Sequence, residues 1–144
     1  MSKTNLKAIQ DLTHTLNRVE DNLTQEKEIL EFIIENTTDG YWDWDMVTNY
    51  EYLSPRLKKQ LGYTDKSMEN SPEAWQVLCH EADLKKAIAK VQKHIASETE
   101  DFSQKLRFTH KKGHEVKVLC RGKIVDRDED NNPLRMIGTH VIID

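Results

Sequence analysis

A stretch near the N-terminus contains neither proline nor glycine, and its apolar residues recur at heptad spacing from Leu6 to Ile34. With Ile9 at position a, seven of the eight a and d positions are apolar, and the exception is Glu26 at d. A stripe confined to a and d is typical of a two-stranded coiled coil, because a helix on its own domain has a wider apolar face. We therefore predict a helix over residues 1–35 that forms a homodimer through Ile9, Leu12, Leu16, Val19, Leu23, Leu30 and Ile33. The alternative is one amphipathic helix packed on the domain of the same chain.

The rest of the chain, 36–144, consists of short segments separated by turn residues. YWDWDMV, from residue 41, alternates with the period of two of a strand, and Thr48-Asn49 predicts a tight hairpin turn to a second strand. Ser-Pro pairs at 54–55 and 71–72 predict the starts of two short helices, and a third helix follows Asp83. Three further strands are predicted in FSQKLRFTH, HEVKVLCRGKIV and LRMIGTHVIID. This order predicts an α+β fold, an antiparallel sheet of about five strands with short helices on one face.

Composition and motifs exclude several classes of function. The net charge is −4 and no basic stripe is present, so we expect no nucleic-acid partner. No stretch approaches the roughly 18 apolar residues of a membrane span, and the N-terminus lacks the apolar core of a signal peptide. The two cysteines, Cys79 and Cys120, form no CxxC motif, which indicates free thiols in a reducing compartment. We expect a cytoplasmic location.

Several short motifs resemble, in their order and spacing, a PAS domain with its C-terminal PAC half. They are DGYWDWD at 39–45, YLSPRLKKQLGY at 52–63, HEAD at 80–83, the strand of Arg107, KKG at 111–113, LCRGKIV at 119–125 and GTH at 138–140. The resemblance covers roughly residues 32–144. It implies a sensory or interaction module of a signalling protein, such as a sensor histidine kinase or a diguanylate cyclase. It implies no enzyme activity in this chain, because any catalytic output domain would lie outside it.

The chain departs from the usual PAS pattern at three places. Lys117 stands where the family often has an aromatic residue, and Asn132 stands in a turn where glycine is common, although asparagine tolerates the same left-handed backbone. The family usually ends Asp-Ile-Thr, and here the corresponding residues are Ile142, Ile143 and Asp144. A polar latch associated with that segment must therefore work differently or be missing.

Enzyme and metal motifs are missing from the sequence. It contains no GxGxxG, GxxxxGK, nucleophile elbow or HExxH. Asp43 and Asp45 lie two residues apart on a predicted strand and fit a hydrated edge better than an acid–base pair. His110 and His114 flank KKG and approach each other across a hairpin, but two imidazoles without a third ligand do not predict a metal site.

Some PAS domains bind haem or flavin, and each cofactor needs characteristic residues. Haem would need a histidine such as His94 on the third helix, which lies beside the apolar stripe and is expected to be half exposed. Flavin of the photosensor type would need an Asn-Cys-Arg motif, and neither Cys79 nor Cys120 provides one. Haem therefore stays an alternative, photosensor flavin is not supported, and Cys120 is expected to be a small buried hydrophobe.

A hollow is expected between the helices and the sheet face that they cross, where a small ligand would fit. Trp42 and Trp44 lie on one face of their strand, and either both belong to the core or one lines this hollow while the other packs on the N-terminal helix. Candidate lining residues are Trp42, Trp44, Trp75, Leu78, Leu106, Phe108 and Met136. Arg107 has the opposite parity and is expected to pair with Glu35 or Asp39.

These observations predict a sensory PAS module that senses a small ligand or a partner and relays the signal through a dimeric helix. The first alternative is a ligand-free domain for dimerisation or protein docking. The second alternative is a haem-based sensor.

Overall fold

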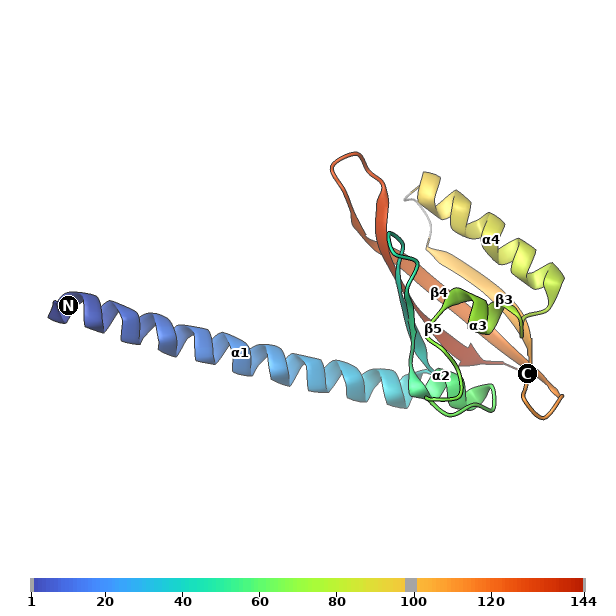
Figure 1. Cartoon of the computed structure of the whole chain (residues 1–144), viewed down its shortest axis with the longest axis horizontal. Coiled ribbons are helices and arrows are strands. Elements are labelled where there is room, and N and C mark those ends of the chain that lie inside the picture. Colours follow the sequence, from blue (N-terminus) through green and yellow to red (C-terminus); the bar gives the residue numbers. More distant parts are fainter. Residues whose placement is uncertain (1, 98–100, 144) are drawn as a thin grey trace. The chain divides into compact units, whose positions relative to one another are not determined.

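The computed structural model describes residues 2–97 and 101–143, so Asp144 of the terminal segment lies outside the described residues. It comprises two compact units, one up to Asn36 and the other from Thr37 onward. The first unit is formed by α1 (Lys3–Thr37), an uninterrupted helix of 35 residues (Figure 1). Its seven predicted seam residues are 46–65% exposed in the single chain. The long helix is confirmed, while its pairing with a second copy stays a prediction.

The second unit contains a five-stranded antiparallel sheet in the order β2-β1-β5-β4-β3 (Figure 1). The last strand therefore lies between the first and the fourth, and β2 and β3 form the two edges. This arrangement confirms the predicted five-stranded antiparallel sheet. The strands are β1 (Tyr41–Asp45), β2 (Glu51–Leu53), β3 (Phe102–Thr109), β4 (Glu115–Arg127) and β5 (Pro133–Ile142).

Three short helices follow the first hairpin, α2 (Pro55–Gln60), α3 (Pro72–Gln76) and α4 (Glu81–Ala96). The predicted Ser-Pro starts are confirmed, because Ser54 Oγ and Ser71 Oγ accept hydrogen bonds from backbone N–H groups in the first turns of α2 and α3. The predicted start of α4, after Asp83, is wrong by three residues, since the helix begins at Glu81. His80 caps this helix by accepting from Ala82 N through Nδ1, which leaves Asp83 in the first turn.

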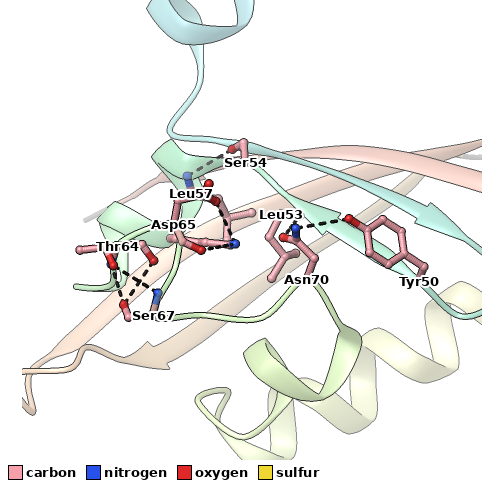
Figure 2. Close-up of polar contacts among 9 residues, drawn as sticks. Tyr50, Leu53, Ser54, Leu57, Thr64, Asp65, Ser67 and Asn70 are labelled. Carbon is pink, nitrogen blue, oxygen red and sulfur yellow. Dashed lines mark hydrogen bonds and ion pairs between the residues drawn. The ribbon is translucent and has the colours of Figure 1, made fainter.

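A polar network attaches the segment between α2 and α3 to the edge of the sheet (Figure 2). Asn70 accepts from Leu53 N at 3.1 Å and donates to Tyr50 Oη at 3.3 Å. The side chain of Lys58 is 1% exposed, and its ammonium donates to the backbone and side-chain oxygens of Asp65 at 2.9 and 3.0 Å. Asn70 thus covers the open edge of β2, which a short edge strand otherwise presents to solvent.

Two turns differ from their predictions. The β1–β2 connection has four residues, 46–49, because Asp45 N donates to Tyr50 O, and Asp45 Oδ1 accepts from the N–H groups of Val47 and Thr48. A side-chain acceptor at the end of β1 thus replaces the tight turn expected at Thr48-Asn49, although Asn49 is left-handed with φ 64°. In the β4–β5 turn the left-handed residue is Asn131, with φ 66°, and not Asn132.

Candidate functional site

A cavity of about 260 Å³ lies between the sheet and the helices α3 and α4. All five strands contribute to its floor, because apolar side chains on one face of the sheet point toward the helices. The floor consists of Trp42, Trp44, Glu51, Leu53, Phe102, Leu106, Cys120, Met136 and His140, with Leu57 from α2. The helices close it with Pro72, Trp75, Gln76, Ala87, Ile88, Val91, Gln92 and Ile95.

The structure brings together five of the seven predicted lining residues. Trp42, Trp44, Trp75, Leu106 and Met136 line the cavity, and both tryptophans of β1 do so. Leu78 and Phe108 instead line a smaller hollow at the edge of β3. The cause is a bridge between Cys79 and Phe108, which places the segment before α4 against this edge. Ligand binding by the five residues stays a prediction.

Glu51 is a cavity residue that the sequence interpretation missed. It is the register partner of Trp44, its side chain is 5% exposed, and its Oε1 accepts a hydrogen bond from Trp75 Nε1 at 2.8 Å. Burial raises the pKa of this carboxyl from 4.5 to about 7. The hydrogen bond from Trp75 lowers the pKa and so opposes the effect of burial, whereas the negative charge of Glu73 raises the pKa further. The signal was present in YEYLS, because Glu51 alternates with two tyrosines and shares the face of Leu53.

Three other polar groups of the cavity wall are neutral near pH 7. Trp42 Nε1 is a buried donor without a hydrogen-bond partner among the described residues. Burial raises the pKa of the Cys120 thiol to about 12, and this residue is the buried cysteine that the sequence predicts. Burial also lowers the pKa of His140 to about 4, so its imidazole carries no charge at neutral pH.

Arg107 binds Asp83, and the predicted pairing with Glu35 or Asp39 is wrong. Its Nε and Nη2 donate to the two carboxylate oxygens of Asp83 at 2.9 and 3.0 Å, and its backbone N–H donates to the same group. Hydrogen bonds from Arg107 hold the pKa of Asp83 below its usual value. The reason for this pairing is that β3 is an edge strand, whose outward backbone groups are accessible to the segment that starts α4.

Asp39 has a different partner, at the end of the last strand. Its Oδ2 accepts from the backbone N–H of Ile142 at 2.7 Å, and Arg56 lies 3.8 Å from its Oδ1. A polar contact therefore exists at Ile142 although the family's aspartate is missing there.

The residues considered for catalysis and metal binding lie elsewhere. Asp43 binds the guanidinium of Arg135 through both oxygens, and Asp45 organises the β1–β2 turn, so they form no acid–base pair. The rings of His110 and His114 stack with centroids 4.2 Å apart, as predicted across their hairpin. Within the described part of the chain, no three His, Cys, Asp or Glu residues are grouped to hold a metal ion.

His94, the residue considered for haem, is buried at 7% exposure and not half exposed as expected. Its Nε2 accepts from the backbone N–H of Ile124 at 3.1 Å, and it does not line the cavity. The histidine that does line the cavity is His140. The donor atom needed for haem is thus engaged in a backbone hydrogen bond, and the chain's residues do not fit haem at this site.

Comparison with known proteins places this architecture in a family. The model of the PAS fold family matches residues 50–140. No curated protein matches the chain. Among the helices of the described residues, none is both long enough and apolar enough to cross a membrane.

Solved structures share the fold at low sequence identity. A sensory box histidine kinase/response regulator from Burkholderia thailandensis is 23% identical, with a TM-score of 0.68 over 79% of this chain and 83% of that one. The N-terminal domain of a diguanylate cyclase with PAS/PAC sensor from Marinobacter aquaeolei is also 23% identical, with a TM-score of 0.60 over 72% and 93%. A PAS domain from Colwellia psychrerythraea is 15% identical, with a TM-score of 0.62 over 84% and 96%. Because the family model matches more than half of the residues, the chain belongs to the PAS fold family.

Proposed function

We propose that this chain is the sensory module of a signal-transduction protein and that it binds a small ligand in the cavity beneath α3 and α4. The observation that carries this proposal is the cavity itself, about 260 Å³ in volume and lined by three tryptophans and a buried carboxyl. A cavity that is mostly apolar and contains a few converging polar groups is the usual form of a small-molecule site. The chain's similarity to PAS domains of a histidine kinase and a diguanylate cyclase supports an output domain of that kind in a longer chain.

The second part of the proposal is a parallel homodimer formed through α1. The seam residues from Ile9 to Ile33 are exposed in the single chain, and apolar residues at a and d positions are stabilised when a second helix covers them. Beyond Glu26 the exposed apolar surface widens, because Ile29 and Phe32 lie outside the seam. This is where we expect the two helices to separate.

Backbone hydrogen bonds connect the cavity floor to two residues that come shortly after α1 in the sequence. His140, on the cavity floor, exchanges backbone hydrogen bonds with Asp39 and Gly40, at 2.8 and 2.9 Å. These two residues follow α1 closely in sequence, since the helix ends at Thr37. We propose that a ligand shifts the population between two arrangements of the helix pair through this connection.

Native mass spectrometry, followed by mass measurement after denaturation, tests this function. We expect a dimer that carries extra mass, and we expect that mass to be lost on denaturation. A dimer without extra mass would favour the alternative, a ligand-free dimerisation or docking domain.

Two double substitutions in α1 test the proposed dimer. Leu16→Asp combined with Leu23→Asp places charges in the seam and should give a folded monomer. Gln10→Asp combined with Asn17→Asp adds the same charge outside the seam and should leave the dimer intact. A dimer that persists in the seam variant would contradict the coiled coil.

A further inference from the structure

Three indoles and one buried carboxyl line the same cavity. Trp44 lies directly opposite Glu51 across the β1–β2 pair, and Trp75 donates its indole N–H to Glu51 Oε1. Trp42 lies two residues before Trp44, on the same face of β1. The chain has three tryptophans, and all of them line this cavity. Such a grouping brings aromatic faces and a negative charge to one place.

The carboxyl has no basic partner. Neither lysine nor arginine lines the cavity, and none forms an ion pair with Glu51 in the described part of the chain. The other groups on the wall do not supply a positive charge either. Cys120 on β4 and His140 on β5 are neutral, and Gln76 on α3 and Gln92 on α4 contribute amides. Glu73, an exposed residue of α3 outside the wall, is itself acidic. A buried carboxyl is satisfied either by taking up a proton, as the raised pKa of Glu51 reflects, or by pairing with a cation, and the wall of this cavity supplies no cation.

We infer that the cavity binds a small organic ammonium ion, whose charge pairs with the Glu51 carboxylate and whose apolar body lies among the three indoles. This inference rests on the proposed ligand-binding function and names the chemical class of the ligand. Cations are attracted to the faces of tryptophan rings, and quaternary and methylated ammonium groups are bound in aromatic cages elsewhere. An anionic ligand would meet a like charge in a desolvated site.

The volume of the cavity limits the size of this ligand. An apolar cavity of about 150 Å³ is enough for benzene, and drug-sized ligands occupy pockets of roughly 300 Å³ or more. At about 260 Å³ this cavity accommodates an amine with one ring, or two fused rings, or an alkyl group of similar size. A ligand that also has an oxygen acceptor would give Trp42 Nε1–H a stronger acceptor than the neighbouring Cys120 thiol.

Isothermal titration calorimetry with a matched pair of probes tests the inference. Benzylamine carries the ammonium group, and benzyl alcohol has nearly the same shape without the charge. We expect benzylamine to bind more tightly than benzyl alcohol at about pH 8, where most Glu51 side chains are ionised. Glu51→Gln should weaken benzylamine binding by roughly 10- to 100-fold, since a hydrogen bond to a charged group is lost, and should leave benzyl alcohol binding nearly unchanged.

Two controls separate the charge of Glu51 from the fold. Glu73→Gln removes the same charge from an exposed position nearby and should change benzylamine affinity by no more than about twofold. The Glu51→Gln variant keeps a side-chain oxygen in place of the one that accepts from Trp75 Nε1, and circular dichroism checks that the variant is folded. In the unmodified protein, benzylamine affinity should fall by roughly tenfold between about pH 8 and pH 6 as Glu51 becomes protonated, while that of benzyl alcohol stays constant.

The outcomes distinguish this inference from the proposed function. If benzylamine binds more tightly than benzyl alcohol and this difference depends on Glu51, both the ammonium site and the ligand-binding function are supported. Binding of benzyl alcohol that equals or exceeds that of benzylamine overturns the ammonium site and leaves a cavity that binds small neutral ligands. If neither probe binds, the ammonium site is contradicted, and the ligand-binding function is then decided by whether native mass spectrometry finds extra mass on the dimer.

Discussion

Gly138 lies directly beneath the indole of Trp42, its register partner on the neighbouring strand. A Cβ atom at Gly138 would overlap Cζ2 of that ring, and one at Gly122, across the β4–β5 pair, would lie 2.7 Å from Cη2. The two glycines therefore allow the ring to lie close against the sheet and to form part of the cavity floor. This contact gives a physical reason for the glycines of the CRG and GTH motifs.

Gly138→Ala should destabilise the domain by about 1–3 kcal/mol, because the added methyl group forces the Trp42 ring or the strand to move. Urea unfolding followed by circular dichroism measures the change in the free energy of unfolding. In a Trp42→Ala background the same substitution should cost less, since the ring is absent, but part of the cost should remain because a Cβ atom at Gly138 would also overlap the backbone oxygen of Arg121. Equal costs in the two backgrounds would show that the contact with the indole is not the cause.

Glu51→Gln should stabilise the empty domain at alkaline pH. The carboxyl has a pKa of 4.5 when unfolded and about 7 when folded, so the folded state binds more protons between these values and stability falls as pH rises through them. At about 1.4 kcal/mol per pH unit, the stabilisation by glutamine reaches about 3 kcal/mol at pH 8 and nearly disappears toward pH 4.5. Unfolding curves measured across this range test the trend.

His140 affects the same curves of unfolding free energy against pH, in the opposite direction. Its pKa is about 4 when folded and 6.5 when unfolded, so its contribution to stability is present above pH 6.5 and is lost as pH falls toward 4. The two pH ranges overlap between about 4.5 and 6.5, where the opposing contributions partly cancel in the unmodified protein, so the rise of stability with pH that His140 causes should be steeper in Glu51→Gln. Glu73→Gln should not reproduce the alkaline gain, because Glu73 is exposed.

Asp83→Ala should destabilise the domain by about 1–2 kcal/mol, since it removes the hydrogen bonds to the backbone and the guanidinium of Arg107. Arg107 remains partly hydrated because its side chain is 41% exposed, which limits the cost. Glu81→Ala, in the same turn of α4, removes a carboxylate that is 85% exposed and should cost less than about 0.5 kcal/mol. Thermal unfolding compares the two variants. A similar loss in both would contradict a specific role for Asp83.

Glu26→Leu should strengthen the proposed dimer of α1, because it replaces the polar residue of the predicted seam with an apolar one. Burying one leucine in each helix favours association by about 2 kcal/mol or more. Sedimentation equilibrium measures the dissociation constant. Glu28→Leu lies outside the seam and should have little effect, and an equal gain in both variants would argue against the heptad assignment.

The predictions that depend on local chemistry agree best with the structure. The Ser-Pro pairs begin α2 and α3, and the alternation of Trp42 and Trp44 places both on one face of the sheet. Serine caps and strand periodicity depend on a few adjacent residues, so they can be inferred from a short segment.

The predictions that failed depend on positions along a strand or on partners distant in sequence. Phe108 shares its face with Leu106, but parity does not show that it lies beyond the end of the cavity, beside Trp75 and His140. The partner of Arg107 depends on β3 being an edge strand, which is decided by the order of the whole sheet. The β1–β2 turn is an exception that failed for a local reason, because the Asp45 side chain accepts from Val47 N–H and so competes with the regular hairpin.

Pulsed electron–electron double resonance tests most directly whether the cavity controls the helix pair. A spin label at Asp21→Cys, outside the seam of α1, reports the distance between the two helices. Cys79→Ser removes the half-buried thiol that would also be labelled, and Cys120 is buried and stays unlabelled. We predict that saturating benzylamine shifts the distance distribution between two populations, and that Glu51→Gln abolishes the shift. A distribution unchanged by saturating benzylamine, in a dimer shown by calorimetry to bind it, would contradict the relay from the cavity to α1.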